Sequence, residues 1–226
     1  ANAAAYGIFF NQGEMCSAAS RLVVHESVRD PLLEKIVEIG RTMMPGDPLD
    51  PKTRLGAIVD QVQLNTVLAF IESGRRQGAN LRFGGNRACI ESGGYFVEPT
   101  VFDNVTMQMK IAREEIFGPV LSAITFKDVD EAVRIANDVS YGLTAAVWSR
   151  DITTAHRVAK ALRAGTVYVN CYDACDITVP FGGFKGDYQS TVVLTPTANG
   201  FPWLAQLSGT SFFNRPTGAT YTMAGD

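Results

Sequence analysis

The sequence has few cysteines, no long apolar run and no excess of basic charge. Four of its 226 residues are cysteine, which is too few for a disulfide framework in a chain of this size. We therefore expect reduced thiols and a cytoplasmic location. No apolar run is long enough to cross a bilayer, so no membrane partner is expected. The net charge of −3 at pH 7 offers no basic surface for phosphates, so nucleic acid is not an expected partner.

A metal site is not expected either. Cys171 and Cys175 are separated by three residues, which is the spacing of half a structural metal site. Such a site needs a second pair of ligands. The only histidines, His25 and His156, lie far from this pair in the sequence.

The pattern of apolar residues predicts alternating helices and strands. Hydrophobic residues make up 46% of the chain and the mean hydropathy is +0.04, enough for one sizeable core. We expect helices over residues 1–10, 30–43, 128–136 and 151–162, and a further helix that Asp60 caps and that Gly74 and Gly78 end. We expect strands over residues 22–26, 80–83, 95–97, 120–126, 143–148 and 166–169. This alternation predicts an α/β fold with a layered, open, mostly parallel sheet flanked by helices.

One cysteine lies in a small, polar and flexible setting between two apolar runs. Cys16 follows Asn11-Gln12-Gly13-Glu14-Met15 and precedes Ser-Ala-Ala-Ser-Arg. Gly13 permits a tight backbone turn, and the small residues after Cys16 leave room for a substrate to approach the sulfur. We interpret Cys16 as a nucleophile, and a buried, inert thiol is the alternative.

The same stretch resembles the nucleophile motif of the aldehyde dehydrogenases, in which the matching cysteine attacks the aldehyde carbonyl. Further segments match in the family's order, namely residues 114–120, Asn137 with residues 141–143, residues 164–170 and residues 180–185. The resemblance covers roughly residues 1–186. Within the family, the chain looks most like the branch that acts on γ-glutamyl-aminobutyraldehyde and related aminoaldehydes.

The resemblance implies NAD or NADP as the cofactor. Glu115 and Phe117 resemble the pair that holds the nicotinamide-side ribose, and a carboxylate is a strong acceptor for two vicinal hydroxyls. Gln63 lies where the family often places another ribose contact. The alternatives are an exposed Glu115, a core Phe117 and an ordinary surface Gln63.

The resemblance also implies four substrate-binding residues. Asn170 resembles an asparagine near the active site, although a strand-end cap is the alternative. Phe181 lies in a segment that resembles the loop closing over the substrate tunnel. The alternative is that this segment is a plain turn. Asp173 and Asp176 lie in the segment that lines the substrate entrance in the family. Two carboxylates there favour a substrate with a distal cation, although ordinary surface acids explain them nearly as well.

In the family, the water-activating glutamate, the oxyanion-hole asparagine and the dinucleotide-binding domain all precede the nucleophile. Here Cys16 is preceded by only 15 residues, and the chain has no G-x-G-x-x-G fingerprint. We therefore expect residues 1–186 to be a catalytic domain without its N-terminal cofactor domain. After Gly186 the sequence departs from the family, so residues 187–226 are expected to be a divergent tail, used in oligomerisation or derived from a fusion.

Two functions follow from this comparison. The first is a partial enzyme that oxidises a small-molecule aldehyde to a carboxylic acid with NAD(P), through a thiohemiacetal and a thioester on Cys16. Its expected partners are further copies of the chain, or a partner that supplies the cofactor domain. The second function is a non-catalytic fragment or binding module that retains the fold.

Overall fold

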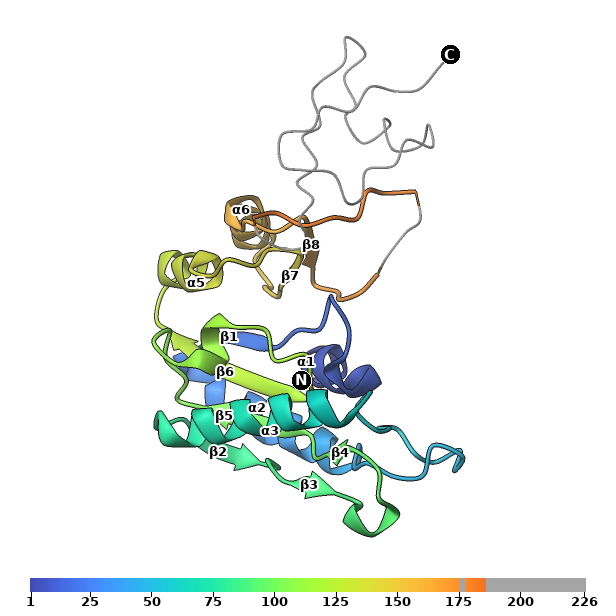
Figure 1. The fold of residues 1–226 in the computed structure, drawn as a ribbon. Coiled ribbons are helices and arrows are strands. Elements are labelled where there is room, and N and C mark those ends of the chain that lie inside the picture. Colours follow the sequence, from blue (N-terminus) through green and yellow to red (C-terminus); the bar gives the residue numbers. More distant parts are fainter. Residues whose placement is uncertain (175–177, 186–226) are drawn as a thin grey trace. The chain divides into compact units, whose positions relative to one another are not determined.

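The chain is divided into two compact units in the computed structural model, which describes residues 1–174 and 178–185 (Figure 1). The first unit comprises Ala1–Asp138, and the second begins at Val139. The tail expected over residues 187–226 lies outside the described residues.

The first unit is built on a four-stranded sheet. Its strands, in spatial order, are β1 (Arg21–His25), β6 (Val120–Phe126), β5 (Thr100–Asp103) and β2 (Asn80–Phe83). The strands β1, β6 and β5 run parallel, and β2 joins the edge antiparallel to β5. A separate antiparallel pair consists of β3 (Arg87–Ala88) and β4 (Phe96–Val97). The prediction of a mostly parallel sheet is confirmed.

Helices cover both faces of this sheet. One face carries α1 (Asn2–Phe9) and α2 (Arg29–Arg41), and the other carries α3 (Gln61–Arg76), α4 (Lys110–Arg113) and α5 (Val129–Asn137). The side chains of β6 alternate between the two layers: Leu121 and Ala123 pack with α1 and α2, whereas Val120 and Ile124 pack with α3 and α4. Because both faces of β6 are buried, its sequence is an almost continuous run of apolar residues.

The helix α3 begins where its cap predicts and ends at Arg76, two residues before Gly78. Asp60 Oδ1 accepts a hydrogen bond from Gln63 N at 2.7 Å, which satisfies one of the free donors of the first turn. Gly78, one of the two glycines expected to end the helix, follows the C-terminal cap with a φ of 90°, whereas Gly74 lies inside the helix. Gly74 instead allows close packing inside the core: a Cβ there would lie 3.0 Å from Ile111 Cδ1 and 3.2 Å from Phe102 Cζ.

The second unit contains two parallel strands joined by a helix. They are β7 (Thr144–Val147), α6 (Ile152–Ala161) and β8 (Thr166–Val169). Asp151 caps α6 by accepting hydrogen bonds from the backbone of Thr153 and Thr154. Hydrogen bonds from the side chain and the backbone of Thr154 lower the pKa of the Asp151 carboxyl. Both the helix and its cap match the expectation from the sequence.

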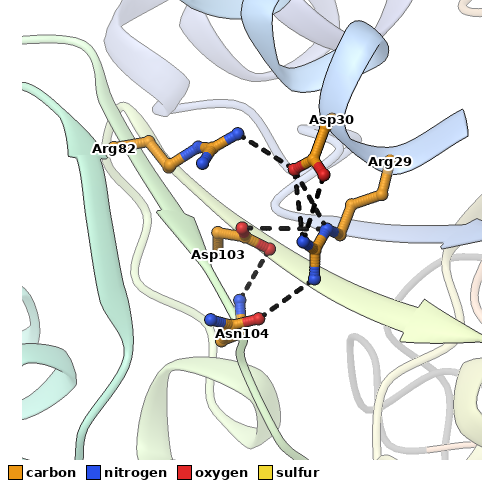
Figure 2. A network of polar contacts seen from close by, with 5 residues as sticks. All are labelled: Arg29, Asp30, Arg82, Asp103 and Asn104. Carbon is orange, nitrogen blue, oxygen red and sulfur yellow. Dashed lines mark hydrogen bonds and ion pairs between the residues drawn. The ribbon is translucent and has the colours of Figure 1, made fainter. Parts of the chain in front are cut away.

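Polar side chains join α2 to one end of the sheet in the first unit (Figure 2). Asp103 is buried at the end of β5, and its Oδ2 lies 3.9 Å from Arg29 Nε. Arg29 also donates to Asn104 Oδ1, and Asp30 accepts from Arg82 of β2 at 3.1 Å. These contacts fix the first turn of α2 against the neighbouring strands β5 and β2.

The remaining elements are single turns of 3-10 helix, namely η1 (Phe10–Gly13), η2 (Glu26–Val28) and η3 (Ile90–Ser92). Within residues 1–174 and 178–185, no helix is both long enough and apolar enough to span a bilayer. In the same part of the chain, Cys16, Cys89 and Cys171 are free thiols.

Candidate active site

The loop that carries Cys16 leaves α1 in an unusual backbone conformation. Asn11, Gln12 and Gly13 have φ values of 49°, 58° and 70° in succession. The left-handed region costs a residue other than glycine roughly 1–2 kcal/mol. Contacts made by the loop must therefore offset this cost at Asn11 and Gln12.

Side chains of the loop bind the backbone of residues 56–59, which we call the bridging segment. Gln12 Oε1 accepts from Gly56 N, and Gln12 Nε2 donates to Ala57 O, both at 3.1 Å. Glu14 Oε1 accepts from Val59 N at 3.1 Å. Three hydrogen bonds from two side chains therefore hold the loop to a segment more than 40 residues further along the chain.

Cys16 is an exposed, free thiol on this loop. It lies in a turn closed by a 3.0 Å hydrogen bond from Ala18 N to Met15 O. The residues that follow are anchored to α1, because Ala19 N donates to Gly7 O at 2.9 Å. Cys16 is thus an exposed residue on an anchored loop, and its role as a nucleophile stays a prediction.

The turn at residues 115–118 carries the two predicted ribose-binding residues. Glu115 is exposed, and Phe117 is 38% exposed with a φ of 54°. Between them, Ile116 is buried in the core and anchors the turn. Gln63 Nε2 donates to Ile116 O at 3.0 Å and to Phe117 O at 2.7 Å. The structure therefore uses the amide hydrogens of Gln63 to support this turn.

The Cys16 loop and this turn meet in direct backbone contact. A Cβ at Gly13 would lie 2.2 Å from Gly118 O and 2.9 Å from Ile8 O. A Cβ at Gly118 would in turn lie 2.5 Å from Val67 Cγ2 of α3. The structure thus brings the Cys16 loop, Gln63 and the turn of Phe117 together within one unit.

Burial affects two charged side chains of the Cys16 motif. For Glu14, burial raises the pKa of the carboxyl, and Asp60 raises it further against the opposing effect of the hydrogen bond from Val59. For Arg21, burial lowers the pKa of the guanidinium to about 10, so it is charged at neutral pH.

Arg21 has a structural role that the sequence did not reveal. Its Nη2 donates to Ile135 O at 2.7 Å and its Nη1 to Ala136 O at 3.3 Å. These carbonyls belong to the last turn of α5, where a cation also complements the helix dipole. The motif that contains the nucleophile candidate therefore ends in a residue that joins β1 to α5.

In the second unit, Asn170 follows β8 and has a φ of 53°. Its Oδ1 accepts from Ser149 N at 3.0 Å and its Nδ2 donates to Ser149 O at 3.1 Å. The side chain of Asn170 thus caps the end of β8, and its role near the active site stays a prediction. These bonds fix the orientation of its amide.

The loop that contains Phe181 lies at the other end of the same strands. A Cβ at Gly165, just before β8, would lie 1.6 Å from Gly182 O. Phe184 N donates to Gly142 O at 2.9 Å, just before β7. The backbone around Phe181 therefore meets the amino ends of the strands, whereas Asn170 follows their carboxyl ends.

The remaining predicted site residues are two acids. Asp173 is exposed and has a φ of 55°. Asp176 lies outside the described residues. Of the eight predicted site residues, Cys16, Gln63, Glu115 and Phe117 thus fall in the first unit, and Asn170, Asp173 and Phe181 fall in the second.

Comparison with known proteins identifies the family. The sequence model of the aldehyde dehydrogenase family matches residues 1–191. The chain belongs to this family. The family resemblance noted in the sequence is therefore confirmed, and the α/β fold agrees with that of solved aldehyde dehydrogenases.

Three solved structures are similar in both sequence and fold, and each is covered to 37% of its length by 81% of this chain. The aldehyde dehydrogenase KauB from Pseudomonas aeruginosa is 60% identical, with a TM-score of 0.79. The γ-glutamyl-γ-aminobutyraldehyde dehydrogenase from Burkholderia cenocepacia is 59% identical, with a TM-score of 0.78. A mutant of the P. syringae indole-3-acetaldehyde dehydrogenase AldA, in complex with NAD+ and IAA, is 54% identical, with a TM-score of 0.80. The chain spans about a third of the length of the curated relatives it matches.

Proposed function

We propose that this chain takes part in the oxidation of an aldehyde to a carboxylic acid with NAD(P)+, and that Cys16 is the nucleophile. The observation that carries the proposal is the backbone contact between Gly13 and Gly118. It joins the loop of an exposed cysteine to a turn with an exposed carboxylate and an aromatic ring. Covalent catalysis and cofactor binding need groups held close together, and family membership makes this reaction the natural one to test.

Cys16 would act through its thiolate. The sulfur attacks the aldehyde carbon, and the carbonyl oxygen becomes the oxyanion of a thiohemiacetal. Loss of hydride with its electron pair leaves a thioester on Cys16. Water then adds to the acyl carbon, the carbon–sulfur bond breaks, and the acid leaves as the thiolate is restored. A thiolate suits both stages, because it is a strong nucleophile and also a good leaving group.

Glu115 and Phe117 fit the ribose and nicotinamide of NAD(P)+. The exposed Glu115 carboxylate is a strong acceptor for vicinal hydroxyls. The partly exposed ring of Phe117, held by Gln63, offers a flat apolar surface beside it. When bound, the cofactor supplies the hydride acceptor. The NAD+ complex of the P. syringae relative supports this choice.

The proposed substrate is an aldehyde with a distal cation. Asp173 and Asp176 would attract such a cation, and one of the similar structures is a γ-glutamyl-γ-aminobutyraldehyde dehydrogenase. Comparison of kcat/KM for 4-aminobutanal and butanal tests this choice. Equal selectivity before and after Asp176→Ala would remove the role of that carboxylate.

Several further features are proposed with the activity. We place residues 1–186 in one catalytic domain, with residues 187–226 as a tail that takes part in oligomerisation. The protein would act as a homo-oligomer, or with a partner that supplies the cofactor domain. Its free cysteines agree with a cytoplasmic location.

The direct test follows reduced nicotinamide by its absorbance while the protein is incubated with an aldehyde and NAD(P)+. We expect Cys16→Ser to abolish turnover and Cys89→Ser to leave it unchanged. Cys89 is a suitable control because its Sγ donates to Pro45 O, at 3.4 Å, and a serine hydroxyl can replace that donor. Turnover that survives Cys16→Ser would exclude Cys16 as the nucleophile. A lack of turnover together with slow, unselective labelling of Cys16 by iodoacetamide would favour a non-catalytic binding module instead.

A further inference from the structure

We propose that Gln12 and Glu14 are positioning residues that hold Cys16 through the bridging segment, residues 56–59. The inference rests on the proposed function only in taking Cys16 as the nucleophile. Neither side chain needs to touch the substrate for this role. Each side chain instead fixes the backbone of the loop that carries Cys16, and this backbone determines where the sulfur lies.

Gln12 makes a two-point contact with the bridging segment. One side-chain amide accepts from Gly56 N and donates to Ala57 O, both at 3.1 Å. Such a two-point contact fixes both the position and the orientation of the amide, since donor and acceptor have to be aligned together. Residues without both groups cannot reproduce it. Glutamate lacks the donor, and methionine lacks both.

The backbone of the loop depends on these contacts. Gln12 itself has a φ of 58°, in the left-handed region that is unfavourable for side chains of its kind. Gly13 beside it fits against Gly118 O with no room for a Cβ. Release of Gln12 would therefore let the loop relax and shift the sulfur, which lies four residues further on.

Glu14 adds a second attachment on the other side of Gly13. Its Oε1 accepts from Val59 N at 3.1 Å, and its own carbonyl oxygen accepts from Asn11 Nδ2 at 3.1 Å. The two positioning residues thus bind opposite ends of the bridging segment. Cys16 follows two residues after Glu14.

The bridging segment also leads directly to the cofactor side of the site. It is followed by Asp60, which caps α3, and then by Gln63, which donates to Phe117 O. One short run of backbone therefore supports the nucleophile loop at its start and the turn of Phe117 at its end. The position of the sulfur relative to the proposed nicotinamide surface therefore depends on this segment.

The test compares four variants of the full chain, namely Gln12→Met, Gln12→Glu, Glu14→Met and Glu14→Gln. The first readout is the rate of iodoacetamide labelling of Cys16 relative to Cys89 and Cys171 in the same sample, measured by peptide mass spectrometry. The second is kcat and the aldehyde KM. We expect the first three variants to change the labelling ratio by about threefold or more and to lower kcat by about tenfold or more at nearly constant KM, because misplacing a reacting group mainly costs rate. Glu14→Gln keeps the acceptor for Val59 N, so its labelling ratio and its kcat should both lie within about twofold of those of the unmodified protein.

Gln61→Met is the matched control, since Gln61 is exposed and its amide donates to Asn65 Oδ1 on the same helix, at 2.9 Å. An unchanged labelling ratio in Gln12→Met and Glu14→Met would overturn the inference, as would failure of Glu14→Gln to restore the ratio. If Gln12→Met does not fold, the labelling ratios of Gln12→Glu, Glu14→Met and Glu14→Gln decide whether the inference holds. Turnover that survives Cys16→Ser overturns the proposed function instead, while the labelling ratio still tests the positioning of the loop.

Discussion

The side-chain amide of Gln63 donates to the backbone carbonyl of Phe117 at 2.7 Å. The two residues are 54 positions apart, and the same amide also reaches Ile116 O. Phe117 has a φ of 54°, a conformation that needs support from its surroundings. The first turn of α3 thus supports the backbone of Phe117, whose ring is proposed to lie against the nicotinamide. In that proposal, Gln63 acts on the cofactor through the protein backbone.

Loss of this support is expected to weaken cofactor binding. Gln63→Leu keeps the size of the side chain but removes both donors, and each hydrogen bond contributes a net ~1 kcal/mol. We therefore expect KM for NAD(P)+ to rise by about tenfold or more, with little change in the aldehyde KM. Gln61→Leu, at an exposed position of the same helix, should leave both values unchanged. An unaltered cofactor KM in Gln63→Leu would show that the turn holds Phe117 without this amide.

The sequence predicts most helices and strands of the fold because their patterns are local. Asp60 and Asp151 cap the helices that were expected after them, and β2, β6 and β8 have the predicted bounds. The strand β5 was missed. It is four residues long, follows Pro99 directly and is buried on both faces. Its sequence therefore has no alternation of apolar and polar residues, and the run is too short to stand out. Only its neighbours β6 and β2 define it.

The site was less predictable, because its contacts join distant segments. Cys16 and Phe117 were identified from motifs, and the structure places their loops in contact through Gly13 and Gly118. Nothing in the spacing of residues indicates that the Gln12 amide pairs with Gly56 and Ala57. A side chain that binds backbone far along the chain leaves no periodic signal.

The close approach of Gly13 to Gly118 predicts a large effect of a single methyl group. In Gly13→Ala the new Cβ would lie 2.2 Å from Gly118 O, and the residue would keep a φ of 70°. We expect a loss of about 3 kcal/mol in the free energy of unfolding, from overpacking and from the left-handed backbone together. Urea unfolding of the variant and of the unmodified protein measures this loss.

Gly93→Ala separates the two causes. Gly93 has a similar φ of 73°, but a Cβ there meets nothing within 4 Å. This variant should lose only about 1 kcal/mol, the backbone contribution alone. Equal losses in the two variants would contradict a steric contact between the loops.

The burial of Glu14 predicts a pH-dependent stability. Its pKa is raised from the ordinary value of 4.5, chiefly by burial, so the folded protein holds this proton more tightly than the unfolded chain. The stabilisation linked to that proton is complete below pH 4.5 and is lost as the pH rises through the raised pKa. Glutamine keeps the acceptor for Val59 N but has no charge to bury.

We therefore expect the Tm of Glu14→Gln to match that of the unmodified protein in acid and to exceed it near neutral pH. A thermal scan across this pH range measures the difference. Glu38→Gln, at an exposed position of α2, corrects for the change in net charge. A constant difference at every pH would show that the Glu14 carboxyl does not cause it.

Arg21 should contribute strongly to stability through the last turn of α5. Its guanidinium donates to Ile135 O and Ala136 O, and burial lowers its pKa only to about 10, so it remains charged at neutral pH. Arg21→Met keeps the aliphatic stem but leaves these carbonyls without that donor. Because hydrogen bonds from a charged group contribute more than neutral ones, we expect a loss of about 3 kcal/mol in urea unfolding.

Arg113→Met provides the comparison for this change. Arg113 is more exposed, and its contacts, to Met107 O at 3.2 Å and to Asp138 at 3.4 Å, are both longer than the 2.7 Å bond from Arg21 to Ile135 O. An exposed ion pair of this kind contributes below about 1 kcal/mol, so this variant should unfold close to the unmodified protein. If both variants lost the same amount, the general loss of positive charge would explain the effect. A loss confined to Arg21→Met would instead show that the arginine at the end of the nucleophile motif holds β1 and α5 together.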